Sequence, residues 1–229
     1  MVSSEAPGAS SHPVAAQVAT TLHKMILDGR LRAGERIKES LLARDLEVSR
    51  NTVRSALISL ESAGFARHTP NKGWVVWQPT EKEIMDLYLA RYHLETAAAR
   101  SVSPSTDFST LKSALDDLLT AYSTSDTQTI VEKDLAFHGA IVGLLGSAHL
   151  DRYYQKLLEA LGYCFTVAYN TAVPRDAASL KQEHLEIYQA ITSGNVDRAE
   201  KIIAKTVMTG REDVRRSLAG ESPLLLEEA

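Results

Sequence analysis

The sequence contains a single cysteine, Cys164, among its 229 residues, so one chain cannot form an internal disulfide. Such cysteine usage is typical of a reducing compartment, and we expect a cytoplasmic location. No apolar run approaches the roughly 20 residues that a membrane-spanning helix needs. The first residues also lack a basic stretch followed by an apolar one, so we expect no secretory signal and no membrane partner.

The composition is that of an ordinary globular protein, with 44% hydrophobic and 24% charged residues. The charge, however, is unevenly distributed. Residues 1–80 carry 10 Lys and Arg against 7 Asp and Glu, a net charge of +3, whereas the remaining residues carry 15 against 22, a net charge of −7. A basic part followed by an acidic part indicates two domains with different partners.

The N-terminal part shows the element order of a winged helix-turn-helix. Apolar residues at helical spacing predict helices over 12–30, 39–48 and 50–63, with a turn and a short extended piece between the first two. The stretch "FARHTPNKGWVVW" at 65–77 predicts two short strands joined at "PNKG". Helix, helix-turn-helix and hairpin together favour a small domain that binds double-stranded DNA.

The third predicted helix has the polar start that a recognition helix needs. Ser49 can cap its N-terminus, and Arg50 and Arg54 lie four residues apart on one face. A recognition helix inserts its N-terminal end into the major groove, where the planar fork of arginine can bind guanine or a phosphate. A solvated helix start in a helical domain without DNA binding would show the same pair, so the spacing leaves both interpretations open.

The stretch "AGERIKESLLARDLEVSRNTVRSALISLESAGFARHTPNKGWVV" resembles the DNA-binding domain of the GntR family of bacterial transcription regulators. The resemblance implies a winged helix-turn-helix in which two residues differ from the usual pattern. Glu47 stands where the family usually has glycine, and Ser40 stands where some members have arginine. We therefore expect a shifted operator preference. The residues expected to contact DNA are Ser49, Arg50, Thr52 and Arg54 in the helix and Lys72 and Gly73 in the wing.

The rest of the chain predicts helices only, six of them up to about residue 218, with turn-forming breaks between them. Short connections favour an antiparallel bundle, which makes the fold class mainly α. On the inward stripes of this bundle lie Asp134 and His138, four residues apart, and His184. A buried carboxylate and two imidazoles need partners, either each other as a structural hydrogen-bonded group or a zinc, nickel or manganese ion.

Three stretches, "RYHLETAAAR", "DLAFHGAIVGLLGSAHL" and "EHLEIYQAITSGNVDRAEKIIAKT", resemble the FCD effector domain of the FadR branch of GntR regulators. The resemblance implies a divalent metal bound by Asp134, His138 and His184, but Thr206 stands where the fourth ligand is expected. Because threonine is a poor ligand for such metals, two alternatives follow. Water or an effector oxygen completes the metal site, or the cavity binds an effector without metal. The expected effector-binding residues are Arg91, Asp134, His138, His184 and Thr206.

The function predicted from these features is a bacterial transcription regulator and not an enzyme. We expect a repressor that binds a pseudo-palindromic operator as a homodimer and responds to a carboxylate metabolite. The alternatives are a metal-dependent hydrolase fused to a DNA-binding module and a helical adaptor that does not bind DNA. The expected boundaries are a disordered N-terminus at 1–11, a winged helix-turn-helix domain at 12–78, a linker at 79–83, a helical effector-binding and dimerisation domain at 84–219 and a tail at 220–229.

Overall fold

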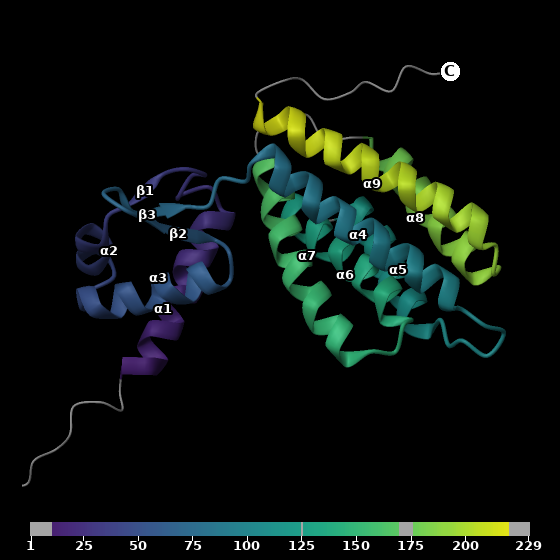
Figure 1. Cartoon of the computed structure of the whole chain (residues 1–229), viewed down its shortest axis with the longest axis horizontal. Helices are drawn as coiled ribbons and strands as arrows, with labels where there is room; N and C mark the ends of the chain where they lie inside the picture. Colours follow the sequence, from purple (N-terminus) through teal and green to yellow (C-terminus); the bar gives the residue numbers. More distant parts are fainter. Residues whose placement is uncertain (1–10, 125, 170–175, 220–229) are drawn as a thin grey trace, which may run out of the picture. The chain divides into compact units, whose positions relative to one another are not determined.

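The computed structural model describes residues 11–124, 126–169 and 176–219. The chain divides after Gln78 into two compact units, which are described separately below (Figure 1). The predicted disorder at the N-terminus and the predicted C-terminal tail lie outside the described residues, except that Ser11 belongs to the first helix. No helix within the described ranges is long and apolar enough to cross a membrane.

The N-terminal unit is the predicted winged helix-turn-helix, and a short third strand joins its hairpin. Its elements are α1 (Ser11–Leu27), β1 (Arg36–Ile37), α2 (Glu39–Asp45), α3 (Arg50–Ser62), β2 (Ala66–Thr69) and β3 (Gly73–Val76). The extended piece expected after the first helix forms β1, which pairs antiparallel with β3, so the sheet order is β1-β3-β2. Within the hairpin Ala66 faces Val76 and Thr69 faces Gly73.

The core of this unit forms where α1 packs against α3. Leu22 and Ile26 of α1 and Val53 and Leu57 of α3 are almost completely buried. The two residues of each helix are four apart, which places them on one face of that helix. The same periodicity leaves the opposite face of α3 exposed to solvent, including Arg50 and Arg54.

Six helices make up the described part of the C-terminal unit, as the sequence predicts. They are α4 (Glu81–Ser101), α5 (Ser109–Thr124), α6 (Thr127–Gly143), α7 (Ala148–Tyr169), α8 (Ala177–Thr192) and α9 (Val196–Leu218). Helix α4 packs against α6, α7 and α9, and α5 packs against α6 and α8 (Figure 1). Side chains of α4, α6 and α8 meet inside the bundle, where Arg91 lies beside His138 and Asp134 lies beside His184.

The connection between the two units is shorter than the linker predicted at 79–83, because α4 begins at Glu81. Thr80 caps this helix in a reciprocal arrangement: its hydroxyl accepts from the backbone N–H of Glu83, whose carboxylate accepts from the backbone N–H of Thr80. Such a capping box satisfies two otherwise unpaired donors at the helix start. Only Pro79 and Thr80 remain outside helix in that segment.

Candidate DNA-binding surface and metal site

The start of α3 is fixed by the predicted cap. The Ser49 hydroxyl accepts a hydrogen bond from the backbone N–H of Thr52 at 3.0 Å, and the two side-chain oxygens lie 2.8 Å apart. Arg50 follows as the first helical residue and is exposed. It forms no hydrogen bond or ion pair with any other described residue, so its guanidinium group is available for an external ligand.

Arg54, in contrast, has a partner within the unit. Its Nε donates to Glu39 Oε1 at 3.0 Å and its Nη2 donates to Glu39 Oε2 at 2.9 Å. Glu39 Oε1 also accepts from the indole N–H of Trp74 at 3.1 Å, so one carboxylate joins α2, α3 and β3. The hydrogen bond from Arg54 lowers the pKa of Glu39. The spacing of residues along the chain does not predict this role of Glu39, because the contact depends on the crossing of two helices.

Of the two predicted wing residues, Lys72 lies in the turn between β2 and β3, and Gly73 is the first residue of β3. Lys72 is exposed, and its backbone N–H donates to the carbonyl of Thr69 at 3.1 Å. Gly73 has φ of +74°, a left-handed conformation that strongly favours glycine. A Cβ atom added there would come no closer than 4.0 Å to Arg36, so the backbone conformation and not the available space explains this glycine.

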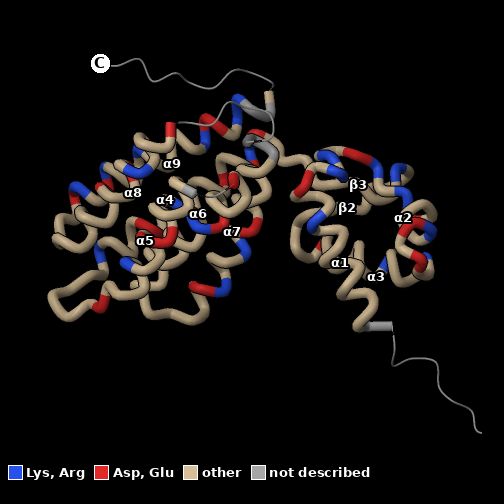
Figure 2. The backbone as a smooth tube through the Cα atoms, turned by 180° about the vertical axis from the view of Figure 1, so that it is seen from behind, with Lys and Arg blue, Asp and Glu red and all other residues tan. Residues whose placement is uncertain are grey.

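Basic and acidic residues lie close to one another along the backbone of the N-terminal unit. Figure 2 shows Lys and Arg distributed over α2, α3 and the strands, interleaved with Asp and Glu. The net charge of residues 1–80 is only +3, and acidic residues lie between the basic ones in the sequence. Contacts of this unit with phosphates must depend on a few well-placed side chains more than on a general positive potential.

The turn before α3 contains a strained residue. Glu47, which replaces the usual glycine, has φ of +54°. A non-glycine residue in this region costs about 1 kcal/mol or more. We therefore expect Glu47→Gly to raise the free energy of unfolding of the N-terminal unit by about 0.5–1 kcal/mol, measured by thermal denaturation. Glu47→Ala is the control. If alanine stabilises as much as glycine, loss of the charge and not relief of backbone strain is the cause.

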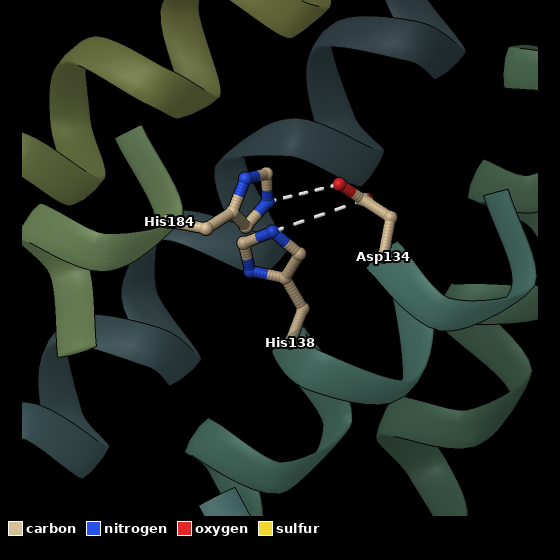
Figure 3. A group of neighbouring side chains, drawn as sticks. All are labelled: Asp134, His138 and His184. Carbon is tan, nitrogen blue, oxygen red and sulfur yellow. Dashed lines mark ion pairs between the residues drawn. The ribbon is translucent and has the colours of Figure 1, made fainter. Parts of the chain in front are cut away.

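In the C-terminal unit, Asp134, His138 and His184 converge as predicted (Figure 3). Asp134 and His138 come from α6 and His184 comes from α8, and one potential ligand atom from each lies within 4.8 Å of the others. Asp134 Oδ1 lies 2.9 Å from His184 Nε2, and Asp134 Oδ2 lies 3.9 Å from His138 Nε2. Both imidazoles are almost completely buried.

In both His138 and His184, the ring nitrogen that is not beside Asp134 is Nδ1, and it lies beside a hydrogen-bond acceptor. His184 Nδ1 lies 2.7 Å from the carbonyl of Leu180, which can only accept, so this nitrogen carries a proton. His138 Nδ1 lies 3.0 Å from Glu95 Oε1. In a neutral ring, a proton on Nδ1 leaves the Nε2 lone pair free, and metal-binding histidines are commonly oriented in this way. The chemistry and arrangement of the three donors therefore fit a divalent cation.

A buried ion pair adjoins this group. Arg91 Nε donates to Glu95 Oε1 at 2.9 Å, and the Tyr154 hydroxyl donates to the same oxygen at 2.6 Å. Arg91 and Glu95 are 2% and 1% exposed. Arg91 Nη2 also lies beside His138 Nε2, so the guanidinium group and a metal ion would compete for that nitrogen.

The ionisation of these groups follows from their surroundings. Burial alone would raise the pKa of Glu95, but His138 and Arg91 beside it lower that pKa to about 2. Burial would raise the pKa of Asp134, but the contact with His184 and the neighbouring positive charges hold that pKa well below its usual range. Burial and the charge of Arg91 lower the pKa of His138, which favours the neutral ring that metals bind.

Thr206 is the remaining residue expected to bind the effector, and no hydrogen bond joins its side chain to the others in the described part of the chain. It is buried on α9, and its hydroxyl has no hydrogen-bond partner among the described residues. The structure thus brings together Arg91, Asp134, His138 and His184, adds Glu95 and Tyr154, and places Thr206 in the interior on a neighbouring helix.

Comparison with known proteins identifies both parts of the chain. The model of "Bacterial regulatory proteins, gntR family" matches residues 14–76, and the FCD domain model matches residues 86–207. An uncharacterized HTH-type transcriptional regulator of Bacillus subtilis (strain 168), YdhC, is 27% identical over 194 residues, 82% of this chain and 85% of that protein. The HTH-type transcriptional repressor GlaR of Escherichia coli (strain K12) is 25% identical over 205 residues, 85% of this chain and 93% of that protein.

Solved structures agree with these matches. A structural-genomics crystal structure of a GntR protein from Rhodococcus sp. RHA1 has a TM-score of 0.73 and 28% identity, covering 88% of this chain and 97% of that chain. These proteins are transcription regulators, and they do not support the hydrolase alternative. A GntR-type helix-turn-helix also implies DNA binding, which argues against the adaptor alternative.

Proposed function

The chain belongs to the GntR family of bacterial regulatory proteins and carries an FCD domain, and from this premise we propose that it is a repressor that an organic acid releases from its operator. As a member of this family it is a DNA-binding transcription regulator with an effector-binding domain. The proposal adds a homodimeric state, a set of DNA-contacting residues, a divalent metal and the chemical class of the effector. Its cytoplasmic location stays a prediction.

The DNA contacts come from the exposed start of α3 and from the wing. Ser49, Arg50, Thr52 and Arg54 of the recognition helix approach the major groove, while Lys72 and Gly73 lie over the backbone. The observation that supports this assignment is that the side chain of Arg54 is paired within the unit, whereas that of Arg50 is not paired with any described residue. Among the described residues the side chain of Arg50 has no partner and can use its fork on a base, whereas Glu39 already occupies one edge of Arg54.

A homodimer follows from the expected symmetry of the operator, since a two-fold protein matches a pseudo-palindromic site. Selection of full-length protein against a random DNA pool tests this directly. We expect an enriched motif with two inverted half-sites about one helical turn apart. Enrichment of a single half-site would contradict the homodimer without contradicting DNA binding.

The metal proposal rests on the charge of the buried cluster as well as on its donors. When both imidazoles are in the neutral form that binds a metal, Arg91 contributes one positive charge and Glu95 and Asp134 contribute two negative charges, a sum of −1. Such a cluster repels a carboxylate. A divalent cation bound by Asp134, His138 and His184 changes the sum to +1 and supplies a Lewis acid that attracts an organic acid.

Because Thr206 is a poor ligand, the protein provides three strong donors and leaves coordination positions for other oxygen ligands. If His138 Nε2 held a cation, the Nη2 group of Arg91, which lies beside that nitrogen, would be available to the carboxylate of the effector, while Nε of Arg91 stayed paired with Glu95. The acid can weaken DNA binding only by binding more tightly to a form of the protein with poorly placed recognition helices.

Metal content is the decisive measurement for this site. We expect one divalent ion per chain in protein purified without chelator or affinity tag, and its loss in Asp134→Ala. Asp116→Ala is the matched control, because Asp116 is an exposed carboxylate paired with Lys112 on α5. Removal of the metal should also abolish any thermal stabilisation by organic acids. Equal metal content in wild type and Asp134→Ala, or no metal in either, would contradict the proposed site.

A further inference from the structure

Two buried hydroxyl groups in the C-terminal unit have no hydrogen-bond partner among the described residues. They belong to Tyr88 on α4, which is 1% exposed, and to Thr206 on α9, which is 8% exposed. Buried polar groups are nearly always paired, because an unpaired one loses its hydrogen bonds to water without replacement. A pair of such groups beside a charged cluster therefore indicates that a ligand or ordered water completes them.

The two hydroxyls belong to the interface between α4 and α9. Gly210 lies one turn after Thr206 on α9, and a Cβ atom added to it would come within 3.4 Å of the Tyr88 oxygen. The hydroxyl of Tyr88 therefore faces the side of α9 that carries both residues. The absence of a side chain at Gly210 provides the space for it.

The same interface leads to the charged cluster. Tyr88 lies one turn before Arg91 on α4, and the guanidinium carbon of Arg91 is 6.0 Å from the centre of the tyrosine ring. Arg91 in turn contacts His138. Burial raises the pKa of Tyr88, so its hydroxyl is neutral and can donate as well as accept.

We propose that Tyr88 and Thr206 determine specificity by binding a hydroxyl group of the effector, which is then a hydroxy-carboxylic acid. This inference rests on the proposed acid-binding function of the cluster. The carboxylate faces the metal and Arg91, and the hydroxyl of the acid exchanges hydrogen bonds with the two protein hydroxyls. Each of these three groups can both donate and accept, so all of them can be satisfied together.

The two protein hydroxyls are neutral hydrogen-bonding groups, because burial keeps the phenol of Tyr88 protonated. They match the neutral hydroxyl of the acid, with which they can exchange donor and acceptor roles. The hydroxyls thus select a hydroxy acid over the corresponding acid without the hydroxyl, since a site built for a hydroxyl is left unpaired by an analogue that lacks it.

The test compares matched acids on the full-length, metal-loaded protein by calorimetric titration. The pairs are lactate and propionate, 2-hydroxyglutarate and glutarate, and gluconate and hexanoate. We expect the hydroxy acid of at least one pair to bind at least about 10-fold more tightly than its partner. Tyr88→Phe and Thr206→Val should each reduce this ratio below about 3-fold and leave the affinity for the acid without hydroxyl unchanged.

Thr96→Val is the control variant. Thr96 is also buried, but its hydroxyl donates to the carbonyl of Tyr92 at 2.7 Å, so its loss should leave the ratio unchanged. In ligand-free protein, Tyr88→Phe and Thr206→Val should not lower the melting temperature, whereas Thr96→Val should lower it. A marked loss of stability in the first two variants would show that structural partners satisfy these hydroxyls and would overturn the inference.

The binding data separate the two levels of the proposal. If acids bind but no pair shows discrimination, or if discrimination survives in both Tyr88→Phe and Thr206→Val, the specificity inference is wrong and the acid-binding function stands. If none of the six acids binds to the metal-loaded protein, the proposed effector class fails, and the specificity inference fails with it.

Discussion

Replacing Glu95 with alanine is expected to destabilise the C-terminal unit by about 3–5 kcal/mol. The carboxylate accepts from Arg91 and Tyr154, and its oxygen lies 3.0 Å from His138 Nδ1. Without it, the guanidinium group of Arg91, which is 2% exposed, remains in the interior without a counter-ion. Such a group cannot lose its charge at any accessible pH, so the full cost of burying it falls on the folded state.

Urea denaturation followed by a signal from the C-terminal unit measures this effect. The control is Asp116→Ala, which removes one partner of the exposed Lys112–Asp116 ion pair and should cost less than about 1 kcal/mol. A double variant, Arg91→Leu with Glu95→Leu, should recover much of the stability, because removing both charges avoids the unpaired one. A cost below about 1 kcal/mol for Glu95→Ala would mean that the ion pair does not stabilise the fold.

The ion pair also marks the limit of what the sequence could predict. Asp134 and His138 were found because residues four apart share a helix face, and their apolar neighbours showed that this face is buried. The same reasoning placed His184 inside. Periodicity identifies the buried face of each helix but not which helices meet there. The network that connects Glu95 with Tyr154 and His138 therefore required the packing of α4 against α6 and α7.

In the N-terminal unit, too, the sequence predicts features that neighbouring residues determine, but not contacts between distant residues. The cap at Ser49 and the helix that follows it depend on neighbouring residues, and the structure has them as predicted. The hydrogen bonds from Arg54 to Glu39 join residues that are 15 apart in the sequence. The spacing of Arg50 and Arg54 does not reveal this contact, so from the sequence the two arginines were equivalent. The left-handed conformation of Glu47 likewise results from the turn and not from the preference of glutamate.

This difference between the arginines leads to the second large expected effect. Arg50→Ala should weaken binding to the selected operator by about 1–3 kcal/mol per half-site and relax the preference at one base pair. Arg50 has no partner among the described residues, so its planar fork can bind a guanine with two hydrogen bonds. In a homodimer two half-sites contribute, and the losses at well-separated contacts should approximately add.

Arg54→Ala should instead weaken binding to all sequences alike. Glu39 occupies the Nε and Nη2 edge of Arg54 and fixes its guanidinium group, and we expect the remaining N–H groups, two on Nη1 and one on Nη2, to bind a phosphate. Loss of one phosphate contact should reduce the slope of log affinity against log salt by about 1 for each half-site. Titrations of the selected operator and of a single-base variant over a salt series measure both quantities, with Lys112→Ala of the C-terminal unit as the control. If Arg54→Ala relaxes the base preference and Arg50→Ala changes only the salt slope, the roles of the two arginines are the reverse of those proposed.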